Sequence, residues 1–149
     1  MITLKRTNSS EADFIDLVKY LDADLKIRDG EDHDFYNQFN SITNIKYCIL
    51  AYEDQIPIGC GGIKAFDEST IEVKRMYVKP EYRGKGVAGK ILMDLEFWAK
   101  ELGYQKCVLE TGVKQPEAIT LYKKSGYDLI ENYGQYKDVE NSLCFEKKL

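Results

Sequence analysis

The sequence predicts an α/β (α+β) fold, in which a mixed and mostly antiparallel sheet is flanked by helices. Three short strand-like runs separated by polar turns in the middle of the chain are typical of an antiparallel meander. A long segment with apolar residues at helical spacing follows and connects the meander to a further strand, as a parallel crossover does. One more helix and two strands complete the expected order β-α-α-β-β-β-α-β-α-β-β.

The first third of the chain is expected to hold one strand and two helices. Residues 2–6 predict the strand. Ser10 and, three residues later, Asp13 resemble a capping box, and the apolar residues after them recur at helical spacing until Gly30. A second, shorter helix is expected around residues 35–39, which include aromatic side chains.

The meander is expected to consist of strands over residues 46–52, 56–66 and 71–78. Polar residues separate these runs and predict tight turns between neighbouring antiparallel strands. Pro80 then ends the pairing, because proline has no N–H to donate.

The second half of the chain is expected to alternate between helix and strand. From residue 87 onward the apolar residues follow one face of a helix, which Gly103 ends. Pro116 stands at the favoured first position of another helix, and Gly126 follows that helix. The expected elements are a helix over residues 87–102, a strand over 106–110, a helix over 116–125, and strands over 127–131 and 141–147.

Length and composition predict a single domain, residues 1–149, of the soluble globular class. Apolar residues make up 44% of the chain and charged residues 31%, which excludes a disordered chain. The first residues lack the apolar stretch of a signal peptide, and no run is long enough to cross a bilayer. A cytoplasmic protein without a membrane partner is therefore expected.

The net charge of −4 argues against general binding of nucleic acid, which depends on contacts to phosphates. The charges are nevertheless unevenly placed. Four cations gather between Lys79 and Lys90 and favour a small anionic ligand, whereas six acidic residues gather between Asp22 and Asp34. The acidic residues are interpreted either as a solvated helix face and loop or as an attraction for a cationic ligand.

The cysteines are expected to be structural. They are widely spaced, they form no C-x-x-C pair, and each lies in a strand-like apolar run. This pattern predicts small buried hydrophobic residues in a reducing compartment. With one histidine in the chain, a metal site is not expected. The four cysteines are Cys48, Cys60, Cys107 and Cys144.

A glycine-rich stretch after the meander has two interpretations. Gly84, Gly86 and Gly89 match the G-x-G-x-x-G fingerprint of dinucleotide-binding proteins, with Glu110 about twenty residues further on. Against a dinucleotide site, residues 79–83 separate the glycines from the strand, that strand ends a meander, and the remaining chain is short for a doubly wound sheet. The alternative is an anion site at a helix N-terminus, where small residues let backbone N–H groups approach a pyrophosphate.

The same stretch, read as R-x-x-G-x-A from Arg83 to Ala88, resembles the acyl-CoA signature of the GNAT superfamily of N-acetyltransferases. Two longer segments, EVKRMYVKPEYRGKGVAGKILMDLE and ETGVKQPEAITLYKKSGY, also resemble the family's central strands and helices. The resemblance covers residues 72–127. It implies a GNAT-like sheet whose central parallel strands splay apart, with acetyl-CoA as the acyl-donor substrate in the gap. The implied donor-binding residues are Met76, Tyr77, Val78, Arg83, Gly84, Lys85, Gly86, Val87, Ala88, Gly89, Gln115 and Tyr122.

The resemblance also implies direct transfer of an acetyl group to a primary amine. Tyr122, in the L-Y-x-x-x-G-Y pattern, matches the family tyrosine that protonates the departing thiolate, a role that suits a hydroxyl donor. Glu72 matches the position at which several members carry a catalytic base, and Glu110 is the alternative base. Alternation along the strand places Glu72 on the same face as Met76. Gln115 departs from the family's frequent asparagine, which leaves its contact open.

The acceptor is expected to be a small-molecule or peptide amine. The acidic residues of the first third prompt the hypothesis of a cationic acceptor, which neutral amides at Asp29, Glu31 and Asp32 would test. Aromatic residues, among them Tyr47, Tyr133 and Tyr136, either line an acceptor pocket or belong to the core. A non-catalytic acyl-CoA-binding sensor is the alternative function, and a homodimer is an expectation by analogy.

Overall fold

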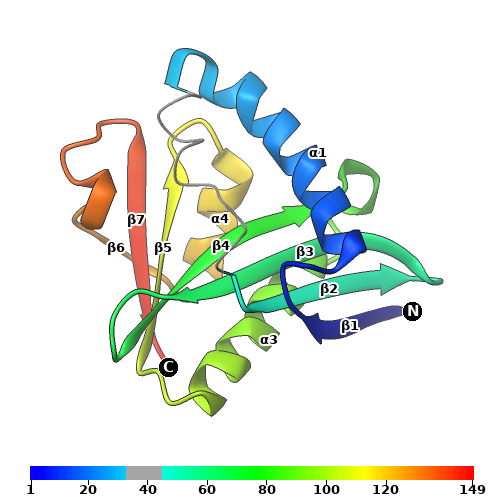
Figure 1. Cartoon of the computed structure of the whole chain (residues 1–149). Coiled ribbons are helices and arrows are strands. Elements are labelled where there is room, and N and C mark those ends of the chain that lie inside the picture. The colour runs from blue at the N-terminus through cyan, green and yellow to red at the C-terminus, as the bar shows by residue number, and fades with distance from the viewer. Residues whose placement is uncertain (33–44) are drawn as a thin grey trace.

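The computed structural model describes residues 1–32 and 45–149. Within these ranges the chain forms a seven-stranded sheet with the order β1-β2-β3-β4-β5-β7-β6 (Figure 1). All neighbours are antiparallel except the central pair β4 and β5, which is parallel. The strands are β1 (Ile2–Thr7), β2 (Tyr47–Glu53), β3 (Ile56–Ala65), β4 (Thr70–Val78), β5 (Lys106–Gly112), β6 (Asp128–Ile130) and β7 (Ser142–Lys148).

Three described α-helices flank this sheet: α1 (Ala12–Asp29), α3 (Val87–Glu101) and α4 (Pro116–Lys124). Helix α1 covers one face, while α3 and α4 pack against the other (Figure 1). The predicted mixed sheet with flanking helices is therefore confirmed. The helix expected around residues 35–39 lies outside the described residues. None of the described helices is long and apolar enough to cross a membrane.

Two apolar clusters form on the opposite faces of the sheet. Alternation along β2 sends Ile49 to the cluster under α3 and Leu50 to the cluster under α1, and both side chains are fully buried. All four cysteines are buried free thiols, which confirms their expected structural role.

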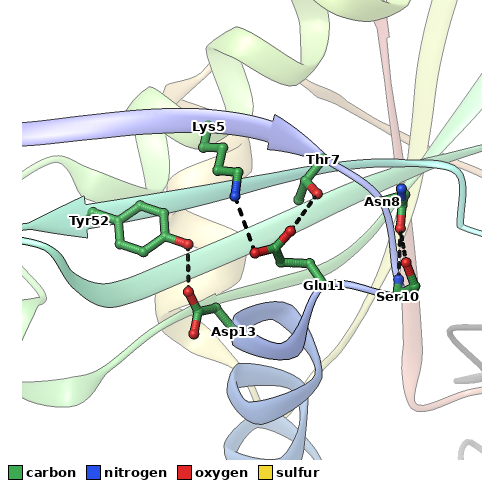
Figure 2. Close-up of polar contacts among 7 residues, drawn as sticks. All are labelled: Lys5, Thr7, Asn8, Ser10, Glu11, Asp13 and Tyr52. Carbon is green, nitrogen blue, oxygen red and sulfur yellow. Dashed lines mark hydrogen bonds and ion pairs between the residues drawn. The ribbon is translucent and has the colours of Figure 1, made fainter.

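The predicted capping box at the start of α1 is wrong. The N-cap residue is Glu11, which makes no side-chain cap bond. Ser10 instead donates both its hydroxyl, at 2.5 Å, and its backbone N–H, at 2.9 Å, to Asn8 Oδ1, and Asp13 accepts a hydrogen bond from Tyr52 of β2 at 2.7 Å (Figure 2). A local turn and a tertiary partner thus compete successfully for both side chains of the expected box.

A β-bulge interrupts β4 in the middle of the sheet. Gly61 of β3 stands opposite two residues, Arg75 and Met76, and Arg75 has a φ of 60°. Because of the extra residue, the side chains that follow it in β4 lie on the opposite face of the sheet from the one that simple alternation predicts. Met76 consequently packs in the cluster under α3, so its expected placement on the same face as Glu72 is wrong.

Strands β4 and β5 pair over only three registered positions. Thr70, Ile71 and Glu72 face Lys106, Cys107 and Val108, and no pairing follows although β4 continues to Val78. Beyond Glu72 the two strands diverge (Figure 1). Their outer edges stay bonded to β3 and β7, so the splay leaves the inner edges without a strand partner.

Close packing of α3 on β3 depends on glycines. A Cβ at Gly61 would lie 2.5 Å from Met76 Sδ and 3.0 Å from side-chain atoms of Ile91 and Leu95.

We expect Gly61→Ala to lower the free energy of unfolding by about 1–3 kcal/mol through overpacking, measured by urea denaturation. Gly89→Ala is the control, because a Cβ there has no atom within 4 Å and alanine favours the helix. Equal effects of both substitutions would contradict the packing argument.

Candidate active site

A cavity of about 360 Å³ opens where β4 and β5 diverge. Its walls come from both strands, the C-terminal half of α1, the loop before α3 with the first turn of that helix, and α4. The gap in the sheet therefore becomes a continuous site that joins the glycine-rich loop to the ends of the central strands.

The glycine-rich end of the cavity has the properties of an anion site. Gly84 and Gly86 have φ angles of 80° and 79°, and a Cβ at either position would meet no atom within 4 Å. Gly86 is the N-cap of α3 and provides no side-chain cap, so backbone N–H groups of the first turn remain available. These groups and the partial positive charge of the helix N-terminus suit a pyrophosphate.

The two cations of this loop behave differently. Arg83 lines the cavity, but its Nε donates a hydrogen bond of 2.8 Å to the Val78 carbonyl oxygen, so it also fixes the loop to the end of β4. Lys85 is exposed outside the cavity wall, with its ammonium 5.5 Å from the centroid of the Tyr82 ring. Geometry thus supports Arg83 more strongly than Lys85 as part of the site.

The middle of the cavity is a slot between a strand edge and a helix. Met76, Tyr77 and Val78 form one wall, on the β4 edge that β5 leaves unpaired. Gln115 and Tyr122 of the α4 region form the opposite wall. An extended ligand can bind main-chain groups of this edge as an additional strand would.

Tyr122 lines the cavity and packs against other aromatic rings. Its side chain is buried, and its ring lies 5.8 Å from Tyr127 and 6.2 Å from Phe145, measured between ring centroids. Burial and the neighbouring charge of Glu110 raise the pKa of Tyr122 above its ordinary value. The phenol therefore keeps its proton at neutral pH and remains a hydrogen-bond donor.

Glu110 lies near the end of β5, and its surroundings raise the pKa of its carboxyl group. Burial raises its pKa to about 7, against the hydrogen bond from Ser142 and the charge of Lys74, while the carboxylates of Asp29 and Glu72 raise it further. The Ser142 hydroxyl donates to Glu110 Oε2 at 2.6 Å. A carboxylate with a pKa close to neutral pH suits general base catalysis.

Glu72 has a different environment, although it faces the same cavity. Tyr133 donates its O–H to Glu72 Oε2 at 2.6 Å, and the Lys74 ammonium lies 3.5 Å from Oε1. Burial and the charge of Glu72 raise the pKa of Tyr133, so this donor stays protonated. Both carboxylate oxygens of Glu72 are therefore engaged within the protein.

The structure brings most of the sequence-predicted site residues to one cavity, with Lys85 as the exception. Tyr136 lines the cavity, and Tyr133 reaches it through Glu72. Tyr47 does not line the cavity; its ring packs 5.2 Å from Trp98 of α3. Sequence reasoning missed further lining residues, because no local pattern marks them: Leu21, Asp24, Leu25, Arg75, Tyr82, Thr111, Glu117, Ala118 and Leu121.

The acidic residues of α1 near the cavity are paired with arginines. Asp22 forms an ion pair with Arg75, and Asp24 lies 3.2 Å from Arg28. Asp29 is buried. These contacts give the acidic run a structural role, which weakens its interpretation as a free surface for a cationic ligand.

Comparison with known proteins identifies the family. Residues 15–127 match the model of the Acetyltransferase (GNAT) family. An 88-residue segment, 57% of this chain and 52% of its relative, is 39% identical to the uncharacterised N-acetyltransferase YjgM of Escherichia coli K12. The matched segment thus spans about half the length of that relative.

Two solved structures share the fold over nearly the whole chain. A candidate acyl-CoA N-acyltransferase from Klebsiella pneumoniae is 28% identical, with a TM-score of 0.84 over 100% of this chain and 98% of its own. A GNAT family acetyltransferase from Elizabethkingia anophelis with acetyl-CoA bound is 22% identical, with a TM-score of 0.70 over 99% and 98%. With its splayed sheet and glycine-rich helix start, this chain belongs to the GNAT family of acetyltransferases.

Proposed function

We propose that this acetyltransferase moves an acetyl group from acetyl-CoA to a primary amine by direct attack. One observation carries the proposal: a single cavity joins a helix N-terminus that suits an anion to the buried Tyr122 and the half-buried Glu110. The first end suits the pyrophosphate of a coenzyme, and the second end suits proton transfer at the reacting atoms.

The donor would be held mainly by backbone groups. The first turn of α3, with Gly84 and Gly86 before it, would hold the pyrophosphate. The unpaired edge of β4 would bind the pantetheine arm, with Gln115 on the opposite wall. Acetyl-CoA supplies the activated acetyl group, and the solved Elizabethkingia relative binds acetyl-CoA within a similar fold.

Glu110 is the general base that the geometry favours. An alkyl amine has a pKa of about 10.4 and must lose a proton before it attacks. Glu110 accepts one hydrogen bond from Ser142, and its pKa of about 7 leaves it able to take that proton at neutral pH. Glu72, bound by Tyr133 and Lys74, is less available and acts as a fixed negative charge beside the base.

Tyr122 would complete the proton balance. The neutral amine attacks the thioester carbonyl, the new C–N bond forms, the C–S bond breaks, and the Tyr122 hydroxyl protonates the departing thiolate. The extra proton on the new amide nitrogen then returns to the Tyr122 phenolate, and Glu110 releases its proton to solvent. No cysteine lines the described cavity, and burial raises the pKa of Cys107 to about 12. Both features support direct transfer rather than a covalent enzyme intermediate.

Calorimetric titration tests the donor site. We expect the protein to bind acetyl-CoA and not NADH, and Gly86→Glu to abolish acetyl-CoA binding, because a carboxylate would occupy the anion site. Gly103→Glu is a matched control, since Gly103 also has positive φ and open space at its Cβ but lies at the far end of α3. Binding without turnover across an amine panel would favour a sensor, and no binding would overturn the proposal.

The base is tested by the pH dependence of kcat/KM. Because the base must be deprotonated, activity should rise with pH through about 7, the pKa of Glu110. Glu110→Gln should remove this limb and lower kcat by on the order of 100-fold or more. Glu72→Gln should retain the limb but move it to lower pH, because a negative charge that raises the pKa of Glu110 is lost. The reverse pattern would identify Glu72 as the base.

Tyr122→Phe tests the acid. The substitution keeps the buried ring and removes the hydroxyl, so kcat should fall by roughly 100-fold or more while the Kd for acetyl-CoA is unchanged. Tyr127→Phe serves as the control, since Tyr127 is also buried but donates to Glu96 at 2.9 Å outside the cavity wall. An unaffected kcat in Tyr122→Phe would exclude the hydroxyl as the proton donor.

A further inference from the structure

Arg75 occupies an unusual position in the wall of the cavity. It is the bulged residue of β4, with a φ of 60°, a region that non-glycine residues seldom adopt. Arg75 lines the cavity between the unpaired edge of β4 and helix α1. Strained positions of this kind are concentrated at functional sites, where the surrounding structure holds them in place.

The guanidinium of Arg75 is incompletely satisfied. The side chain is only 2% exposed, and its Nη2 is paired with Asp22 of α1. Its Nε is buried without a hydrogen-bond partner among the described residues. Buried N–H groups are nearly always bonded, so an oxygen from outside the described chain is the natural partner of this donor. Arginine presents its N–H groups as a fork that suits a carboxylate.

The charges around Arg75 divide the cavity into two sides. Lys74, the residue before Arg75, also lines the cavity, but its ammonium is paired with Glu72 at 3.5 Å, so Arg75 is the β4 cation that has an unpartnered donor among the described residues. The carboxylate of Glu110 lies on the other central strand. Two acidic residues of α1, Asp22 and Asp24, are paired with arginines. A ligand with an anionic group toward β4 and an amine toward β5 matches this arrangement.

We propose that Arg75 binds a carboxylate of the acceptor, so that the preferred acceptors are amino acids or similar amines with a carboxylate close to the nitrogen. This inference rests on the proposed acetyl transfer and specifies its acceptor class. It disfavours the simple diamines and polyamines that the acidic N-terminal run suggests.

Matched acceptors test the class on the unmodified protein. Each pair consists of an amino acid and its decarboxylated amine: tyrosine and tyramine, phenylalanine and phenethylamine, lysine and cadaverine. Release of free CoA thiol gives kcat/KM, and the carboxylate should raise it by about 10- to 100-fold in the preferred pair. Amines that react as well as their amino acids would overturn the carboxylate site while acetyl transfer stands. Turnover of neither member of any pair would count against acetyl transfer itself.

Variants of Arg75 then separate recognition from structural support. Arg75→Gln, and Arg75→Asn as a residue that tolerates positive φ, should raise KM for the amino acid and leave the decarboxylated amine and the Kd for acetyl-CoA unchanged. Arg6→Gln is the control, because Arg6 pairs with Asp94 at 3.2 Å on the α3 side, away from the cavity. Weaker acetyl-CoA binding would show that Arg75 contributes to binding of the acetyl donor. An equal loss of kcat/KM for the amino acid and its decarboxylated amine would show that the role of Arg75 is structural. Either result overturns the proposal.

Discussion

The end of pairing between β4 and β5 after Glu72 is the constraint on which the rest of the site depends. Both strands keep an antiparallel neighbour on their outer edges, so they can separate without leaving the sheet. Main-chain N–H and C=O groups in the gap then lack strand partners, and such groups need hydrogen bonds. The splay therefore creates a place for an extended ligand and at the same time opens the cavity to the helix start at Gly86.

The bulge at Arg75 adds a second consequence to the splay. Because it reverses the facing of β4, Met76 moves into the core under α3 while Glu72 and Lys74 remain beside Arg75 at the cavity. Gly61 makes this possible, since any Cβ there would collide with Met76 and with α3. Gly61 thus permits both Met76 and α3 to pack closely against β3.

Two carboxylates on neighbouring strands acquire different chemistry from their surroundings. Glu72 is engaged by Tyr133 and Lys74, whereas Glu110 accepts a hydrogen bond from the Ser142 hydroxyl and lies half-buried beside other negative charges. Tyr133 comes from the segment between β6 and β7, and Ser142 begins β7. The distinction between a fixed charge and a proton acceptor is therefore made by residues far along the chain.

For the described residues, the sequence by itself determined the element order, the mixed sheet, the buried cysteines and the glycine-rich turn before α3, because periodicity and turn residues act locally. Tertiary structure alone decided the start of α1, where Tyr52 takes Asp13, and the bulge, which depends on the cross-strand partner Gly61. It also decided which glutamate is available and which acidic residues are neutralised. A pKa and an ion pair depend on distances between segments, and no local pattern encodes those distances.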